Sequence, residues 1–259
     1  LFGGLESIQR NVNRKNTDLK FYEFGRCYHV KGEESKTYSE ETHLGMWLTG
    51  NKTAQAWTGK TEKCSFYLLH AYVNKVLHRL GVNVDKLVLE PAIDPQGESC
   101  CGICQCFSDG LVIKTQNGTV LGYMALVERG LLKKFDIDNP VYYADLYWNA
   151  LLQENKRYKP VIEDLPKFPE VSRDFALLVN KDIQFADLKK AAMETERKLL
   201  KAVSLFDVYE GKNLEEGKKS YALNFVLQDK DDTLKDKQIE YIMSRLQKTF
   251  EEKFGAKLR

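Results

Sequence analysis

The sequence has no long hydrophobic run and little net charge. No apolar stretch reaches the ~18 residues that a membrane-spanning helix needs, and no charged-then-apolar signal peptide opens the chain. The formal net charge of the 259 residues is +2, too small to indicate nucleic-acid or membrane binding by charge alone. These absences predict a cytoplasmic protein with no membrane partner.

Signatures of common catalytic centres are also missing. The sequence contains no phosphate-binding Walker loop, no HExxH metal motif and no nucleophile elbow. The four histidines are scattered and are interpreted as surface or core residues. The chain alone is therefore predicted to be non-catalytic, with no catalytic residue and no metal ligand.

Six cysteines are too few, in a chain of this length, for a disulfide scaffold. Four of them lie in the segment Cys100–Cys106, while Cys27 and Cys64 stand apart. The Cys-Cys-x-x-Cys-x-Cys spacing offers four sulfurs to zinc, but the second half of a zinc-ribbon pattern is missing. Buried or surface thiols are the favoured interpretation, and a thiol or metal-dependent enzyme using this cluster is the alternative.

Composition and proline positions predict two domains. Hydrophobic residues make up 43% and charged residues 29%, which is ordinary for a globular protein that buries a core. Pro160, Pro166 and Pro169 lie close together among charged neighbours, as in a linker. The predicted domains are residues 1–160 and 167–259.

The first domain is predicted to combine helices with a mainly antiparallel sheet, because hairpins join several strands. Helical spacing predicts helices at 5–13, 65–80 and 128–135, the second closed by Gly81. Predicted strands cover 21–30, 43–49, 86–90, 102–107, 111–115, 119–126 and 141–146, with a loop over 31–42. Asn117-Gly118 predicts a type I′ hairpin turn.

The second domain is predicted to be a ferredoxin-like βαββαβ unit. Strands are predicted at 173–180, 202–209 and 218–227 and at the terminus, and helices at 185–200 and 234–254. Thr233 is the predicted N-cap of the second helix, with Asp236 at the capping-box position. The predicted fold class of the whole chain is α+β.

One face of this small sheet should be free, because both helices of such a unit cover the other. Alternation along 218–227 places Tyr221 and Phe225 under the helices and Ser220 on the free face. The same reasoning places Asp207 and Tyr209 beside Ser220. An aromatic ring with a carboxylate and a hydroxyl suits stacking on a nucleobase and reading its edge.

Other interpretations of this surface remain open. Tyr209 could be an ordinary exposed strand tyrosine, and Asp207 an edge charge that discourages aggregation. The small domain could also be a structural module that binds protein. An RNA-recognition domain of the other common ferredoxin-like type is not favoured, because its aromatic octamer matches residues 219–226 only in part.

Several separated motifs stand in a specific order. In the second domain they are Phe206-Asp207-Val208-Tyr209-Glu210-Gly211, Gly217-Lys218-Lys219-Ser220, Thr233-Leu234-Lys235-Asp236 and the final Leu258-Arg259. This order resembles the ferredoxin-fold anticodon-binding domain of the bacterial-type phenylalanine–tRNA ligase beta-subunit family. Residues 6–8, 13–15 and 21–26 resemble that family's catalytic-like module, a class II synthetase fold without its chemistry. One departure is the segment 98–107, where the family usually has a His-Pro-Gly-Arg-like sequence.

The resemblance implies the C-terminal part of a beta subunit, with the first part of the catalytic-like module missing. In that family a catalytic alpha subunit charges tRNA(Phe) with phenylalanine, using ATP and Mg²⁺, within a heterotetramer of two alpha and two beta subunits. The implied partners are therefore tRNA(Phe) and the alpha subunit. No cofactor is expected in this chain itself.

The resemblance also implies roles for four residues. Tyr209 would be the stacking platform for the first anticodon base, and Asp207 and Ser220 would bond the edge of that base. Arg259 would contact a base or a phosphate. Strand alternation reaches the first three residues independently, whereas Arg259 depends on the resemblance alone.

Overall fold

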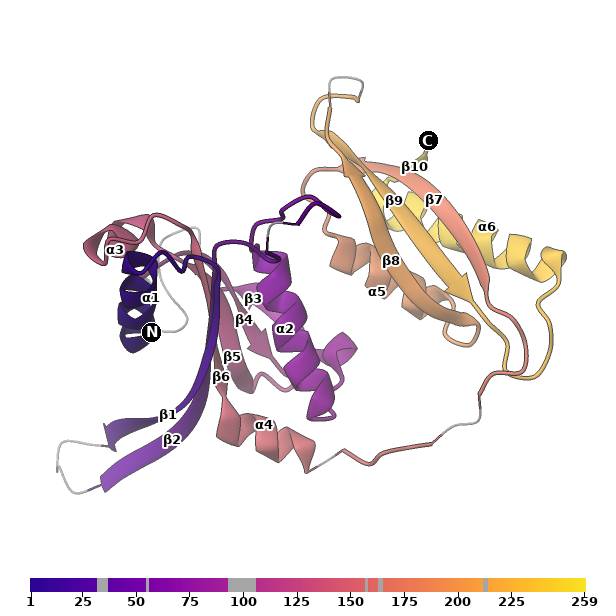
Figure 1. The fold of residues 1–259 in the computed structure, drawn as a ribbon. Coiled ribbons are helices and arrows are strands. Elements are labelled where there is room, and N and C mark those ends of the chain that lie inside the picture. The colour runs from indigo at the N-terminus through magenta and orange to yellow at the C-terminus, as the bar shows by residue number, and fades with distance from the viewer. Residues whose placement is uncertain (32–36, 55, 93–105, 157, 163–164, 212–213) are drawn as a thin grey trace. The chain divides into compact units, whose positions relative to one another are not determined.

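The chain folds into two compact units. A computed structural model describes residues 1–31, 37–54, 56–92, 106–156, 158–162, 165–211 and 214–259 (Figure 1). The units are Leu1–Val161 and Ile162–Arg259, named unit 1 and unit 2 below. Their boundary falls in the proline-containing stretch, where the described residues between Asn155 and Val171 form neither helix nor strand.

Unit 1 contains a six-stranded sheet in the order β1-β2-β6-β5-β4-β3. Every pairing in it is antiparallel, where a mainly antiparallel sheet was predicted. The strands are β1 (Leu19–Lys31), β2 (Thr37–Thr49), β3 (Val88–Pro91), β4 (Phe107–Lys114), β5 (Val120–Val127) and β6 (Val141–Tyr147).

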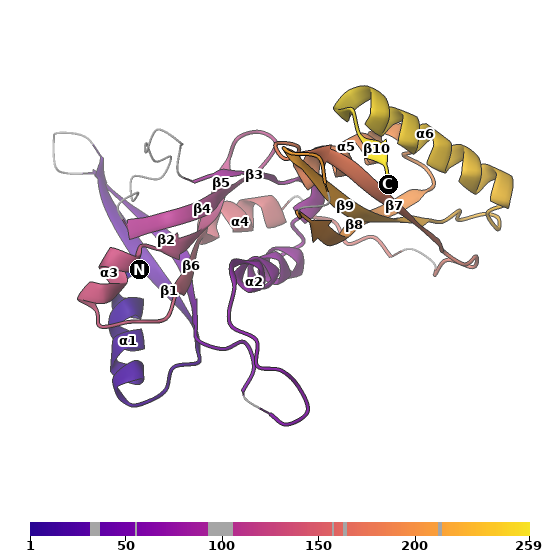
Figure 2. The ribbon, with the colours of Figure 1, turned by 90° about the horizontal axis from the view of Figure 1, so that it is seen from above.

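Helices cover both faces of this sheet (Figure 2). On one face pack α1 (Phe2–Asn13) and α3 (Arg129–Lys134), through Leu5, Ile8 and Leu132. On the other face pack α2 (Phe66–Arg79) and α4 (Trp148–Asn155). The short 3-10 helix η1 (Val84–Lys86) lies between α2 and β3 in the chain. Two separate apolar cores result, one on each side of the sheet.

Several details of unit 1 differ from the predictions. Strand β2 begins at Thr37, so the loop predicted over 31–42 is too long, because backbone pairing with β1 supports a polar strand there. Helix α4 was not predicted, because it has only eight residues and buries only Leu151. The predicted strand 102–107 lies mostly outside the described residues, and β4 runs without a break from Phe107.

Turns and helix ends in unit 1 follow backbone chemistry. Gly81 has a φ of +72° and ends α2, as predicted, with Val82 N–H donating to the Leu77 carbonyl. The 115–118 turn is not type I′, because Asn117 lacks the positive φ that this turn requires. Gly118 alone has a positive φ, and its N–H donates to the Thr115 carbonyl at 2.9 Å.

Unit 2 has the predicted ferredoxin-like topology. Its four-stranded antiparallel sheet has the order β10-β7-β9-β8. The elements in chain order are β7 (Val171–Asn180), α5 (Phe185–Thr195), β8 (Leu200–Tyr209), β9 (Lys218–Leu227), α6 (Asp236–Phe254) and β10 (Lys257–Leu258).

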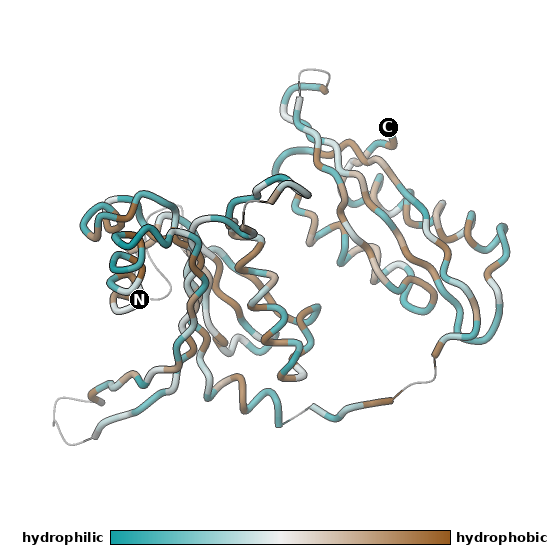
Figure 3. Tube along the Cα trace, in the orientation of Figure 1, coloured by the Kyte–Doolittle hydropathy of each residue, from teal (hydrophilic) through white to brown (hydrophobic). Residues whose placement is uncertain are grey.

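Both helices of unit 2 pack on one face of its sheet. Along α6, hydrophilic and hydrophobic stretches alternate turn by turn (Figure 3), and Leu246 and Phe250 are fully buried. The Phe225 ring of β9 contacts Phe250 of α6 and Phe175 of β7, with ring centroids 6.0 and 5.4 Å apart. The core of this unit therefore lies on one side of the sheet.

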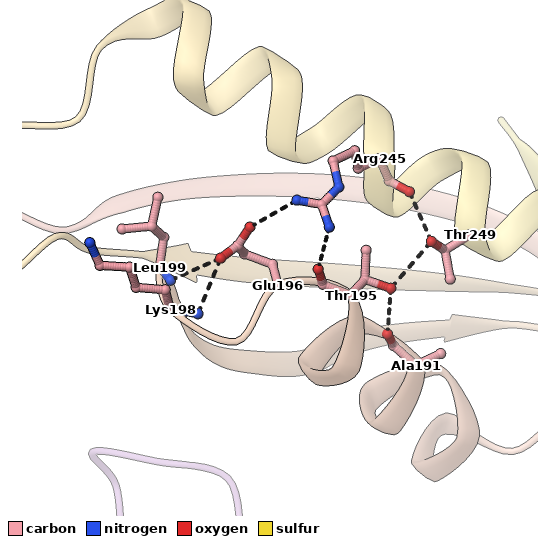
Figure 4. Close-up of polar contacts among 7 residues, drawn as sticks. All are labelled: Ala191, Thr195, Glu196, Lys198, Leu199, Arg245 and Thr249. Atoms are coloured by element: carbon pink, nitrogen blue, oxygen red, sulfur yellow. Dashed lines mark hydrogen bonds and ion pairs between the residues drawn. The ribbon is translucent and has the colours of Figure 1, made fainter.

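A polar clamp joins the end of α5 to α6 (Figure 4). Arg245 donates to the Thr195 carbonyl at 2.7 Å and pairs with Glu196 at 3.4 Å. Glu196 Oε1 accepts the backbone N–H groups of Lys198 and Leu199. These bonds hold the backbone in a non-helical conformation just after Thr195. The helix predicted to reach residue 200 therefore ends five residues earlier.

The start of α6 also differs from the prediction. Its N-cap is Lys235, and Gln238 Oε1 accepts the Lys235 backbone N–H at 3.0 Å. Thr233 lies before the helix, where its own N–H donates to Asp232. Gln238, three residues after the N-cap, therefore forms the capping-box bond that was predicted for Asp236.

Candidate functional site

Among the described residues of unit 2, no helix packs on one face of the sheet. The register of β9 decides which residues face it: Leu223, Phe225 and Leu227 are fully buried in the core beside the helices. Residues at the alternate positions, Ala222 and Asn224, point to the other side. We name this helix-free side the open face.

A bulge in β8 brings Asp207 to the open face. Leu205 pairs with Leu223 on the helix side, yet Asp207 pairs with Ala222, so the register shifts between Leu205 and Asp207. Without the extra residue Phe206, Asp207 would share the face of Leu205, because side chains alternate along a strand. The bulge therefore re-aims Asp207, and Tyr209 follows it as the partner of Ser220.

Tyr209 and Arg259 meet over the open face from opposite edges of the sheet. Tyr209 ends β8, and Arg259 follows β10, anchored by its N–H to the Ala176 carbonyl at 2.9 Å. The guanidinium carbon lies 5.6 Å from the centroid of the Tyr209 ring. This distance is within the range of a cation–π contact. Tyr209 as a whole residue is 39% exposed.

Ser220 and Asp207 differ sharply in exposure. Asp207 is exposed, and its carboxylate forms no hydrogen bond or ion pair with the described residues. Ser220 lies on the same face but is only 6% exposed. Tyr209 and Leu178 are its partners on the neighbouring strands. The expectation that phenol, acid and alcohol are exposed together therefore holds for the first two groups only.

A second polar group lies farther along the open face. Asn224 Nδ2 donates to Ser172 Oγ and to Asp174 Oδ1, the latter at 2.7 Å. At the Tyr209 end, Lys218 donates to Glu215 and holds the pKa of that carboxyl below its ordinary value. Lys218 belongs to the motif of residues 217–220, but the sequence analysis assigned no binding role to any of these residues.

Unit 1 offers weaker candidates. The cysteine segment of the alternative hypothesis lies outside the described residues, apart from Cys106. Burial raises the pKa of the Cys64 and Cys27 thiols, which disfavours the nucleophilic thiolate. Arg26 forms an exposed ion pair with Glu40 at 2.8 Å.

A partly buried polar cluster surrounds Asp145 on β6. His43 Nδ1 lies 2.8 Å from Asp145 Oδ1, and the Tyr123 hydroxyl donates to Oδ2 at 3.4 Å. Burial and the nearby Asp145 charge raise the pKa of Tyr143. Among the described residues, no group of three or more metal-ligating side chains is assembled here or elsewhere. None of the described helices is long and apolar enough to cross a membrane.

Two family models match the chain. Residues 1–148 match the phenylalanyl tRNA synthetase beta chain CLM domain. The chain belongs to the phenylalanyl tRNA synthetase beta chain family. Residues 166–259 match the ferredoxin-fold anticodon binding domain. The matched range includes all four strands of the unit 2 sheet and therefore its open face.

Individual relatives agree with this family. The phenylalanine–tRNA ligase beta subunit of Bacteroides fragilis is 49% identical over 265 residues, which cover 100% of this chain. The corresponding subunits of Porphyromonas gingivalis and Syntrophotalea carbinolica are 42% and 33% identical, over 100% and 98% of this chain. The chain spans 31% of the first two relatives and 30% of the third.

Among solved structures, a pyrrolysyl tRNA synthetase from Desulfitobacterium hafniense is similar, with 15% identity and a TM-score of 0.42. That similarity covers 60% of this chain and 48% of the other. A TM-score this low adds nothing to the assignment of this beta-chain family member.

Proposed function

We propose that unit 2 binds the anticodon of tRNA(Phe) on its open face. Tyr209 stacks on the first anticodon base, while Asp207 and Ser220 bond the edge of that base. Arg259 contacts a base or a phosphate. In this proposal residues 167–259 form the anticodon-binding domain and residues 1–160 a catalytic-like scaffold without chemistry of its own.

The observation that carries the proposal is the Tyr209–Arg259 pair over a sheet face without helices. An aromatic ring and a guanidinium are the two planar groups on which unstacked RNA bases most readily stack. Here they come from opposite edges of the sheet and meet. This surface lies in the part of the chain that matches an anticodon-binding domain.

Binding should rearrange this pair. Ser220 is buried, so its hydroxyl can reach a base only after neighbouring side chains move. Tyr209 lies opposite Ser220, and Arg259 lies over the Tyr209 ring. We expect the incoming base to take the place of the guanidinium beside the ring, which frees Arg259 to contact the RNA.

The chemistry of the ligase is assigned to another subunit. A catalytic alpha subunit attaches phenylalanine to tRNA(Phe) with ATP and Mg²⁺, in a cytoplasmic heterotetramer of two alpha and two beta subunits. The described residues of this chain form no set of metal ligands for Mg²⁺, so no step is assigned to them. The contribution of this chain is to hold and select the tRNA.

Titration with an anticodon stem-loop of tRNA(Phe) tests the proposal. Tyr209→Ala should weaken binding by roughly 1–3 kcal/mol, the usual contribution of one base stacked on an aromatic side chain. Tyr241→Ala is the matched control, because Tyr241 is also an exposed tyrosine with an arginine over its ring, Arg245 at 5.7 Å, but it lies on α6. The control should bind like the wild type.

A stem-loop with a changed first base separates specific from nonspecific binding. The wild type should prefer the native loop, and Tyr209→Ala should lose most of that preference. Affinity should fall with salt for both loops, since phosphate contacts release counterions. Equal affinity of the wild type for both loops, or equal effects of the two tyrosine changes, would contradict the proposal.

A further inference from the structure

Gly211 lies directly against the ring of Tyr209. A Cβ atom placed on Gly211 would be 2.3 Å from the Tyr209 hydroxyl oxygen and 2.5 Å from Cζ. Cβ atoms essentially never lie within 3.0 Å of another residue's heavy atoms, so no side chain fits at position 211 unless something moves. The φ of Gly211 is not positive, and alanine could therefore adopt its backbone conformation. The requirement for glycine comes from the ring.

The backbone at this point is held on both sides. Tyr209 is the last residue of β8 that pairs with β9, through Ser220. Glu210 forms an ion pair with Lys181 at 3.9 Å, and the Gly211 carbonyl accepts the Leu214 N–H at 3.2 Å. The atoms that a Cβ would meet are the tip of one side chain. The ring, and not the backbone, is therefore the part that would yield.

We propose that Gly211 is a positioning residue for anticodon recognition. By having no side chain, it lets the Tyr209 ring fold toward the end of β8 and present its face to Arg259. A stacked base lies parallel to the ring, so the orientation of the ring determines whether the base edge reaches Asp207. This inference rests on the proposed function, because it concerns the same surface.

Gly211→Ala should leave stability nearly unchanged and still weaken stem-loop binding. Alanine is compatible with the backbone, and displacing an exposed ring tip disturbs no core contact. We expect about a tenfold loss of affinity for the native loop, within the range for one stacked base. The preference for the native first base should fall as well. Glu210→Gln is the control, because it removes the neighbouring ion pair with Lys181 and leaves the ring unchanged, and it should keep that preference.

The double variant decides whether Gly211 acts through Tyr209. With the ring gone, Gly211→Ala has nothing to displace, so Tyr209→Ala/Gly211→Ala should bind like Tyr209→Ala alone. Additive losses would overturn the inference, as would a Gly211→Ala variant that binds and discriminates like the wild type.

Failure of this inference can be told apart from failure of the proposed function. If Tyr209→Ala removes the preference for the native loop and Gly211→Ala does not, only the role of Gly211 is wrong. If the wild type itself does not distinguish the two loops, the proposed function is wrong and the role of Gly211 falls with it.

Discussion

The two sheets of this chain are both antiparallel, but they are covered differently. The unit 1 sheet carries helices and an apolar core on each face. The unit 2 sheet carries helices on one face only, and its other face presents Asp207, Tyr209 and Asn224. A sheet face on which helices pack is not free to bind a partner. A sheet covered on one side has a rigid surface free for binding.

The difference is visible within a single strand of unit 2. On β9, Phe225 is fully buried against two other rings, while its neighbour Asn224 faces the open side. Side chains that pack in the core therefore alternate with side chains that are free of the helices. A substitution on one face should affect stability, and one on the other should affect binding.

The largest expected effect tests this alternation. Phe225→Ala should destabilise unit 2 by about 3–5 kcal/mol, because it removes a buried ring and leaves a cavity. Asn224→Ala should cost under about 1 kcal/mol, because its hydrogen bonds are exposed to water. Hydrogen exchange of the β9 and α6 amides measures the loss of stability in both variants. Equal losses would show that the open face also holds the fold together.

A second pair of variants tests how tightly α1 packs on the unit 1 sheet. Gly4 of α1 lies against Trp47, and a Cβ there would be 2.2 Å from the indole. Gly4→Ala should therefore cost about 1–3 kcal/mol through overpacking. Gly3→Ala, with nothing within 4 Å, should instead stabilise the helix by about 0.5–1 kcal/mol. Urea unfolding followed by tryptophan fluorescence reports on unit 1, which contains all three tryptophans. Effects of the same sign would argue against tight packing of α1 on the sheet.

The smallest expected effect concerns the clamp between α5 and α6. Arg245→Ala removes the bond to the Thr195 carbonyl and the ion pair with Glu196, both partly exposed, so we expect a loss of about 1 kcal/mol in the stability of unit 2. Calorimetry measures this loss, and stem-loop affinity should not change. A loss of affinity in Arg245→Ala would mean that the helix side also takes part in binding.

Much of the fold could be predicted from the sequence because regular elements have periodic patterns. The order of elements in unit 2 follows from alternation along β9 and the helical stripe of α6. Boundaries set by single side-chain bonds could not be predicted, such as the stop after Thr195, which depends on Arg245 some 50 residues later. The short helix α4 has too weak a pattern to be detected.

The candidate site was predictable only in part. Alternation assigned Tyr209 and Ser220 to one face, but burial of Ser220 depends on neighbours from other strands. The contact between Arg259 and Tyr209 crosses the whole sheet and has no local signal. Lys219 looks like a solvated turn residue in the sequence. In the structure it is buried, donating to the Lys181 carbonyl and lying over the Tyr221 ring.

The central claim is that RNA binds the open face of unit 2, and a nuclear magnetic resonance titration tests it most directly. Adding the tRNA(Phe) anticodon stem-loop to the isotope-labelled chain should shift the signals of Asp207, Tyr209, Ser220 and Arg259 first. The signals of the outward side of α5 and α6 should stay in place. Shifts confined to the helices, or no shifts in unit 2 at all, would contradict the account.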